Sequence, residues 1–265
     1  MIKKHYLEEL NIHSKYIRLN DKGIDVKRIQ EWILLWTFIN KDFKVSIVRD
    51  GEFGTGTLHA VKEFQKMKNL DADGIIGNIT WRALTEPMLK AFSRIDRSTL
   101  DEFVIGYAQA HLDSCSREFV PNQGPWVRAY MNGKEGSDFP WCMGFVQTVL
   151  DQAYSSRGKA FTDYLPYTLA CDDLGNYGLA KNKLIRNADL KKRLNEVQPG
   201  DVFLVCKKDN PLDWTHTGFV VALNGSEIET IEGNTNEAGS REGVMVRKRT
   251  RNLSKENIDV FSVGE

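Results

Sequence analysis

One stretch organises the larger part of the chain, Phe139-Pro140-Trp141-Cys142-Met143-Gly144-Phe145-Val146-Gln147-Thr148-Val149-Leu150. From residue 145 the apolar side chains recur at helical spacing, at positions 145, 146, 149, 150 and 153. Pro140 suits the first turn of a helix, because the N–H that proline lacks would have no partner there. The pattern therefore predicts a helix that begins near Cys142, and its buried stripe fixes where the thiol points.

A thiol at the start of a helix has a distinct chemistry. The positive end of the helix macrodipole favours the thiolate, which is the nucleophilic form of cysteine. A single cysteine in an apolar segment is more often a buried structural residue. Cys142 therefore needs a partner before it can be interpreted as a nucleophile.

A β-hairpin is predicted further along the chain. Residues 199–205 contain a Pro-Gly turn and a short apolar run, which indicate one strand. Two more β-rich runs, 214–223 and 226–235, are separated by Asn224-Gly225, which is a strong hairpin signal. His216 lies at the start of the first of these two runs.

The register of this hairpin determines which side chain meets the imidazole. A strict two-residue turn at Asn224-Gly225 pairs His216 with Gly233 and points Glu232 and Asn234 away from it. A one-residue bulge or a longer turn brings either Glu232 or Asn234 opposite His216. Both alternatives are compatible with the sequence.

Together these residues could supply the nucleophile, the base and the orienting group of a cysteine hydrolase. A thiol needs a base to form the thiolate near neutral pH, and the imidazole needs a third polar group to fix its tautomer and orientation. Cys142, His216 and Glu232 or Asn234 supply these three roles. His216 alone would be interpreted equally well as a hydrogen-bonded strand histidine, so the hypothesis depends on the whole set.

The C-terminal two-thirds of the chain resembles the CHAP family, the cysteine- and histidine-dependent amidohydrolases/peptidases. The matching segments are Trp141-Cys142-Met143-Gly144-Phe145-Val146, Pro199-Gly200-Asp201-Val202, His216-Thr217-Gly218-Phe219-Val220-Val221 and Ile231-Glu232-Gly233-Asn234-Thr235, with a lead-in at residues 122–130. The resemblance implies a papain-like fold in which Cys142 is the nucleophile and His216 the general base. It also implies that Glu232 orients His216, with Asn234 as a helper or replacement. Several family members have glutamine before the cysteine where this chain has Trp141, so the oxyanion donors stay open, and the backbone N–H of Cys142 is one candidate.

The N-terminal part contains an internal repeat. Residues 50–61, Asp-Gly-Glu-Phe-Gly-Thr-Gly-Thr-Leu-His-Ala-Val, match residues 73–84, Asp-Gly-Ile-Ile-Gly-Asn-Ile-Thr-Trp-Arg-Ala-Leu, at an offset of 73 − 50 = 23. In each copy Asp-Gly predicts a tight turn, and a following threonine is expected to cap the next helix. With an amphipathic helix before them, around residues 26–36, these segments predict a small three-helix bundle.

This unit, residues 14–88, resembles the peptidoglycan-binding domain type 1. The resemblance is carried by Asp-Gly-x-Phe-Gly…Thr…Ala-Val…Phe-Gln at 50–65 and by the second copy at 73–84. It implies binding to the cell wall. Residues 86–99 are expected to be a connector, and residues 164–176 a loop.

Composition and charge narrow the class of protein. The chain has 36 basic and 36 acidic side chains, so its formal net charge is +0, and no nucleic-acid partner is expected. With Cys142 assigned to catalysis three cysteines remain, an odd number that argues against a disulfide framework. No Cys/His cluster has zinc spacing, no apolar run is long enough to span a membrane, and residues 1–10 lack the apolar segment of a secretory signal.

The predicted protein is a two-domain α+β chain, with a helical peptidoglycan-binding domain at residues 1–90 and a papain-like hydrolase domain at residues 91–265. In the latter a helix packs on an antiparallel sheet. We expect a monomer, without metal or cofactor, that is made in the cytoplasm and acts on peptidoglycan after release by a pore or by lysis, as endolysins do. Trp141 and Trp214 flank the catalytic residues in sequence and are expected to line the substrate cleft.

The sequence leaves the scissile bond open. An N-acetylmuramoyl-L-alanine amidase and a peptidoglycan endopeptidase would use the same three groups, and the shape of the cleft chooses between them. Two further alternatives are a non-catalytic wall-binding protein and a wall-degrading toxin effector.

Overall fold

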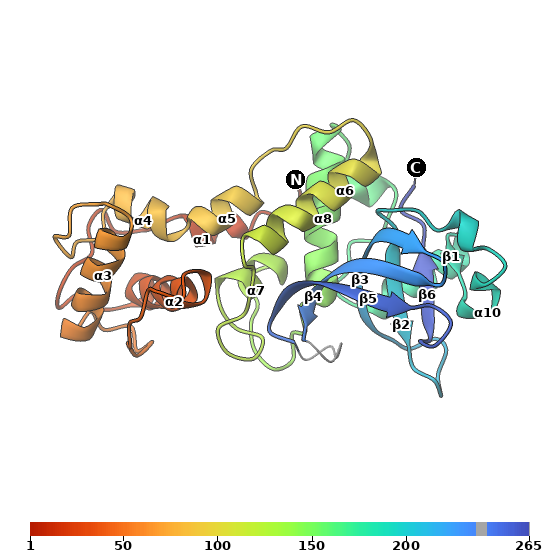
Figure 1. Cartoon of the computed structure of the whole chain (residues 1–265). Coiled ribbons are helices and arrows are strands. Elements are labelled where there is room, and N and C mark those ends of the chain that lie inside the picture. The colour runs from red at the N-terminus through yellow and green to blue at the C-terminus, as the bar shows by residue number, and fades with distance from the viewer. Residues whose placement is uncertain (237–242, 265) are drawn as a thin grey trace.

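The computed structural model describes residues 1–236 and 243–264. Its helices are α1 (Tyr6–Leu10), α2 (Ile24–Ile39), α3 (Thr55–Met67), α4 (Asn78–Leu84), α5 (Glu86–Ala91), α6 (Leu100–Asp113), α7 (Pro125–Tyr130), α8 (Cys142–Ser156), α9 (Cys171–Ala180) and α10 (Asn187–Leu190). Its strands are β1 (Leu184–Ile185), β2 (Val202–Cys206), β3 (Trp214–Asn224), β4 (Glu227–Thr235), β5 (Met245–Asn252) and β6 (Ile258–Phe261). Helices α2, α3 and α4 lie at one end of the molecule, and the sheet lies at the other, where α8, α9 and α10 pack on it (Figure 1).

The described strands form one antiparallel sheet with the order β1-β6-β2-β3-β4-β5. Its side chains alternate between two cores, as the period of a strand requires. Leu204 and Phe219 belong to the large core under α8, whereas the adjacent Phe203 and Val220 belong to a smaller core on the opposite face. The prediction of an α+β fold with a helix packed on an antiparallel sheet is confirmed.

Helix α8 begins at Cys142, as the apolar spacing predicts, and every residue from 142 to 154 is buried. The residue that precedes its first turn is Trp141, so Pro140 lies outside the helix rather than within it. The helix packs against β3 and β4. Gly144 lets α8 also approach α7 closely, because a Cβ there would lie 2.7 Å from the carbonyl oxygen of Tyr130.

The β3–β4 turn lies one residue later than the sequence predicts. Asn224 pairs with Glu227, so the two turn residues are Gly225 and Ser226, and Gly225 adopts a φ of 60°. A bulge between Val220 and Ala222 then shifts the register again. Of the two registers that the sequence permits, the structure has the bulged one.

In the N-terminal unit, the second Asp-Gly turn is held by one buried glutamine. The Gln65 Nε2 donates to Asp73 Oδ1 at 2.9 Å, to the Ile75 carbonyl at 3.1 Å and to Thr80 Oγ1 at 3.2 Å. The Gly74 N–H donates back to Gln65 Oε1 at 2.8 Å, with Gly74 at a φ of 78°.

The first Asp-Gly turn repeats this arrangement around Gln30. Its Nε2 donates to Asp50 Oδ1 at 2.9 Å and to Thr57 Oγ1 at 3.1 Å, and the Gly51 N–H returns a bond of 2.9 Å. The repeated threonine therefore accepts a bond from the glutamine instead of capping the next helix, and no side chain caps α3 or α4. The internal repeat in the sequence is a repeat of this hydrogen-bond network.

Two segments differ from expectation. Residues 86–91, expected within a connector, form α5, because Pro87 is compatible with a first helical turn and Met88 and Ala91 are buried. Residues 171–180, whose first half was expected to be loop, form α9. Their glycines serve packing: a Cβ at Gly175 would lie 2.6 Å from the Trp214 ring.

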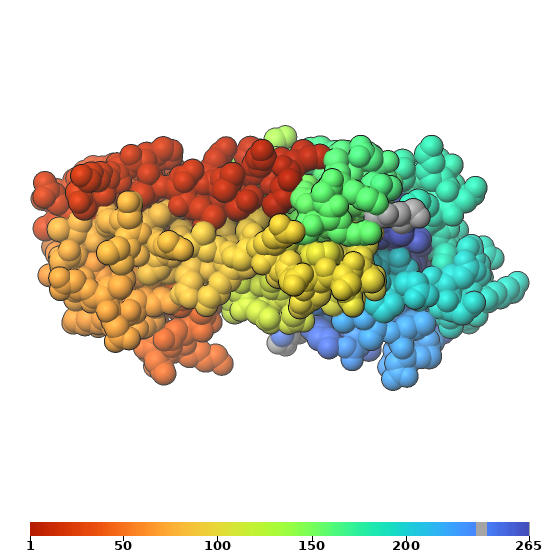
Figure 2. Space-filling view, turned by 90° about the horizontal axis from the view of Figure 1, so that it is seen from above, coloured from red at the N-terminus to blue at the C-terminus, as the bar shows by residue number. Residues whose placement is uncertain are grey.

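The two predicted units share one apolar core, in which the Trp32 and Trp126 rings meet edge to face with centroids 6.2 Å apart. The chain's first residues lie along α5 and reach the sheet-bearing part (Figure 2). There the backbone N–H groups of Ile2 and Lys3 donate to the Asp151 carboxylate at 2.7–2.9 Å. The boundary near residue 90 stays a prediction.

A partly buried cation also joins the two units. Arg128 on α7 contacts the carboxylates of Glu9, Glu31 and Glu135 at 2.7–2.8 Å. In the part of the chain that the structure describes, no helix has both the length and the apolar character of a membrane span.

Candidate active site

Three elements bring the predicted catalytic set together. Cys142 is the first residue of α8, His216 lies on β3, and Glu232 lies on β4. The His216 Nε2 and the Glu232 Oε2 are 2.9 Å apart. All three side chains are almost removed from solvent, with exposures of 4% for Cys142, 2% for His216 and 0% for Glu232.

The second ring nitrogen of His216, Nδ1, is buried and makes no hydrogen bond of regular geometry, whereas Nε2 is bound to Glu232. Nδ1 is therefore the ring nitrogen that remains for Cys142, which influences the pKa of the imidazole. The two side chains interact both by hydrogen bonding and by charge. The pKa of the thiol is lowered and the pKa of the imidazole is raised, and both directions favour a thiolate beside an imidazolium.

The surroundings favour this ion pair. A hydrogen bond from Cys171 lowers the pKa of the Cys142 thiol well below its ordinary value, and His216 adds to this effect, so that together they outweigh burial. Burial opposes the charge on His216, but Cys142 and Glu232 outweigh it and raise the pKa of the imidazole. A thiolate is the form that attacks a carbonyl carbon.

Glu232 is itself held by a buried arginine. Arg251 on β5 binds both carboxylate oxygens, Nε to Oε1 at 2.6 Å and Nη2 to Oε2 at 2.7 Å, and Thr230 donates to Oε1 at 2.6 Å. Burial would raise the pKa of Glu232, but His216 and Arg251 hold it at about 2. The carboxylate is therefore ionised and fixed in orientation.

Sequence reasoning did not find Arg251 or Cys171. A signal for Arg251 was present, because arginines at 247, 249 and 251 alternate along β5 and so share one face, next to β4. Cys171 gave no signal, since it is the first residue of a helix that the sequence did not predict and it lies 29 positions from Cys142 (171 − 142).

The structure does not bring Asn234 to the imidazole as a hydrogen-bond partner. The residue is buried with a φ of 54°, and neither its Oδ1 nor its Nδ2 has a hydrogen-bond partner. Glu232 thus occupies the orienting position that the sequence left open between the two.

The tryptophans beside the catalytic residues lie in the core. The Trp141 indole donates to Glu118 Oε2 at 2.9 Å and its ring stacks on Tyr130, whereas the Trp214 indole donates to Asp259 Oδ2 at 2.9 Å. Both rings are buried. They support the backbone on either side of the site rather than forming an open wall of a cleft.

No group of three or more histidine, cysteine or acidic residues among those described has the geometry of a metal site. The other histidine of the sheet-bearing part, His111, is a core residue that bonds Gln152 and Tyr130 at 2.8 Å each. Burial lowers the pKa of His111 to about 4, so it stays neutral.

Residues 22–84 match the family model described as a putative peptidoglycan binding domain. This part of the chain is therefore a peptidoglycan-binding domain type 1, and it indicates association with the cell wall. Comparison with curated proteins and with solved structures gives no significant match. The resemblance of the C-terminal part to the CHAP family stays a prediction.

Proposed function

We propose that the chain is a cysteine hydrolase that cleaves amide bonds of peptidoglycan. The observation that carries the proposal is the buried line Cys142–His216–Glu232, in which Glu232 binds Nε2 and leaves Nδ1 for the thiol. A purely structural cysteine and histidine would need neither an ionised carboxylate behind the ring nor a thiol with a lowered pKa.

The proposed reaction has two halves. The Cys142 thiolate attacks the carbonyl carbon, and the His216 imidazolium protonates the departing amine, which leaves a thioester on Cys142. Neutral His216 then takes a proton from water as the water attacks the thioester. When the acid leaves, the thiolate and the imidazolium are restored.

The peptidoglycan-binding domain explains why a hydrolase of this kind would be joined to a second domain. A hydrolase acting on an insoluble polymer gains effective concentration when a second site on the same chain holds that polymer. We infer that the protein acts on the wall after release from the cytoplasm, in the manner of an endolysin.

The test is mass spectrometry of fragments released from purified peptidoglycan, by the native chain and by Cys142→Ala. The native chain should release soluble fragments and Cys142→Ala none, while both should sediment with the wall polymer. Cys115→Ala is the matched control and should cleave like the native chain, because Cys115 belongs to neither α8 nor the His216 contact.

The fragments also identify the bond. Free stem peptides with intact glycan strands would define an amidase, and shortened stems still attached to muramic acid would define an endopeptidase. Activity retained in Cys142→Ala would refute the mechanism. Absence of fragments from every variant, with wall binding intact, would leave a non-catalytic wall-binding protein.

A further inference from the structure

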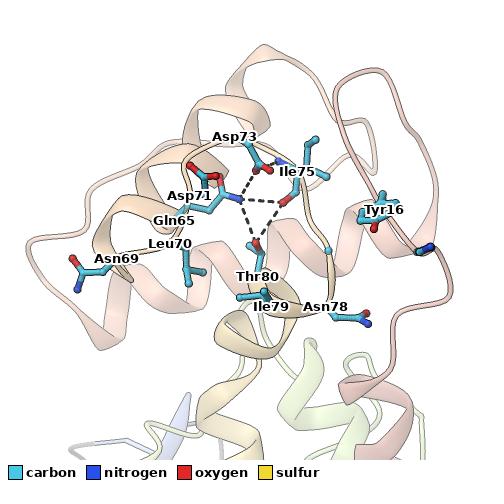
Figure 3. A pocket seen from close by; sticks show the side chains of 12 residues that line it. Tyr16, Gln65, Asn69, Leu70, Asp71, Asp73, Ile75, Asn78, Ile79 and Thr80 are labelled. Carbon is cyan, nitrogen blue, oxygen red and sulfur yellow. Dashed lines mark hydrogen bonds between the residues drawn. The ribbon is translucent and has the colours of Figure 1, made fainter.

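The second Asp-Gly turn of the peptidoglycan-binding domain borders a surface cavity of about 500 Å³ (Figure 3). Gln65 and Thr80 form its rigid inner side, since both belong to the repeated hydrogen-bond network. The side chains that remain available around the cavity are Lys15, Tyr16, Asn69, Asp71, Asn78 and Ile79.

An exposed aromatic platform borders this cavity. The Tyr16 side chain is 60% exposed, and its ring lies over Gly77, where an added Cβ would be 3.5 Å from Cδ1 and Cε1 of the ring. Ile79 is 74% exposed at the same cavity. The Lys15 Nζ lies over this ring, 5.4 Å from its centroid. An exposed aromatic ring on a supported edge is suited to pack against the C–H face of a ligand once the flexible lysine side chain turns aside.

Three polar side chains that line the cavity are not used by the fold. The side chains of Asn69, Asp71 and Asn78 are exposed and make no hydrogen bond within the described residues. An apolar surface with a few free amides and a carboxylate is typical of a small-ligand site. Amide groups and a carboxylate pair well with hydroxyl and acetamido groups.

The net charge of the cavity further restricts the chemical class of ligand that it can bind. Lys15 contributes +1 and Asp71 and Asp73 contribute −2, which gives a net charge of −1. This field disfavours an anionic ligand such as the carboxylate-bearing stem peptides of peptidoglycan. It does not disfavour the uncharged N-acetylglucosamine residues of the glycan strand.

We propose that this cavity binds the glycan strand of peptidoglycan, with a β-1,4-linked N-acetylhexosamine stacked on Tyr16. Asn78, and farther from Tyr16 along the cavity Asp71 and Asn69, hydrogen-bond hydroxyl and acetamido groups of the strand (Figure 3). The proposal rests on the wall association of this domain and names the part of the polymer that it holds. It does not depend on the hydrolase.

The first copy of the repeat is an internal control. At the offset of 23 residues, Thr55 and Gly56 stand where the second copy has Asn78 and Ile79. The first copy thus keeps the glutamine network but lacks the amide and the exposed apolar side chain at the cavity. Of the two copies, the second alone has an amide side chain and an exposed apolar side chain at these positions.

The experiment is isothermal titration of the full chain carrying Cys142→Ala, so that nothing is cleaved. The probes are tetra-N-acetylchitotetraose, peptide-free glycan strands of peptidoglycan whose lactyl carboxylates have been amidated, and a free stem tetrapeptide. Both glycans should bind and the tetrapeptide should not. Adding Tyr16→Ala should weaken glycan binding at least tenfold, Tyr16→Trp should preserve it, and Thr55→Ala in the first copy should leave it unchanged.

Two results would overturn the proposal. One is binding of the tetrapeptide, or of intact wall polymer, without binding of glycan strands. The other is glycan binding by Tyr16→Ala with the affinity of the parent chain, with circular dichroism confirming that the variant is folded. Loss of hydrolysis in the fragment assay would bear on the hydrolase alone, because these titrations use a chain that cannot cleave.

Discussion

The Glu232 side chain passes over Gly218 to reach His216. A Cβ built on Gly218 would lie 3.0 Å from the Glu232 Cγ, 2.7 Å from the Ile231 carbonyl oxygen and 2.8 Å from the Phe203 ring. Gly218 therefore leaves the space through which the carboxylate reaches His216 Nε2 at 2.9 Å. The bulge that follows on β3 sets the register in which this can occur.

Gly218→Ala should displace Glu232 from His216. Overpacking at a buried site costs about 1–3 kcal/mol of unfolding free energy. A shift of the orienting carboxylate by about 1 Å should lower kcat on the order of 100-fold. Denaturant unfolding and peptidoglycan turnover measure the two effects.

Gly56→Ala is the matched control for this substitution. An added Cβ there meets no atom within 4 Å, and Gly56 lies in helix α3, where alanine is preferred. The control should gain about 0.5–1 kcal/mol and keep full turnover. An equally active Gly218→Ala would show that the path of Glu232 over Gly218 has no functional role.

Arg251→Met should remove the two hydrogen bonds that fix the orientation of the Glu232 carboxylate. Arg251 is buried and binds both oxygens of the carboxylate, so its loss leaves a buried charge without its main partner. Removing one member of such a pair costs about 3–5 kcal/mol. We expect lower unfolding free energy and lower kcat with KM little changed, because Arg251 acts through Glu232 and does not touch the thiol.

Lys248→Met, on the same strand, separates this effect from a general loss of charge. Its ion pair with Glu229 is about half exposed on both sides, and such pairs contribute about 0–1 kcal/mol. If the two variants lost equal stability and activity, Arg251 would be one more surface charge rather than a positioning residue.

Cys171→Ala should make the Cys142 thiolate harder to form. The hydrogen bond from Cys171 is the largest of the contributions that lower the pKa of Cys142. In the native chain the acid limb of kcat/KM should follow the lowered pKa of Cys142, and the alkaline limb should follow the raised pKa of His216. The variant should move only the acid limb, toward higher pH.

The pH dependence of Cys142 alkylation by iodoacetamide measures this directly. Cys206→Ser is the control, because Cys206 bonds Asp259 at 3.1 Å in another part of the core and burial raises the pKa of its thiol. An unmoved alkylation profile in Cys171→Ala would remove Cys171 from the site.

Acid should weaken the fold through Glu232. Its folded pKa of about 2 lies below the ordinary value of 4.5, so its ionised form stabilises the fold fully above about pH 4.5. This contribution is lost as the pH falls from about 4.5 to about 2. Glu232→Gln should therefore flatten the acid limb of stability in urea titrations at several pH values, whereas Glu227→Gln, at an exposed position on the same strand, should not.

Much of the architecture follows from local patterns. The 3.6-residue spacing after Cys142 predicts α8, because an apolar stripe of that period can be buried only as a helix. The repeat at an offset of 23 residues predicts two equivalent turns, since Asp-Gly needs the same left-handed glycine in both copies. Alternation predicts the strands that carry His216 and Glu232.

Two helices and the role of the repeated threonines could not be predicted from local sequence patterns. Helices α5 and α9 were missed because proline and glycine indicate loops unless tertiary packing needs their shape, as Gly175 does beneath Trp214. The threonines of the repeat were expected to cap helices, but Gln30 and Gln65, which come before the turns in sequence, bind them instead.

The sequence by itself determined that a cysteine begins a buried helix, that a histidine begins a strand, and that a carboxylate and an amide lie on the neighbouring strand. These are properties of local periodicity and of residue chemistry. Only the tertiary structure decided between Glu232 and Asn234, through a bulge of one residue and the open space above Gly218. It alone brought Arg251 and Cys171 to the site, because contacts between distant segments depend on how helices and strands pack and leave no period in the sequence.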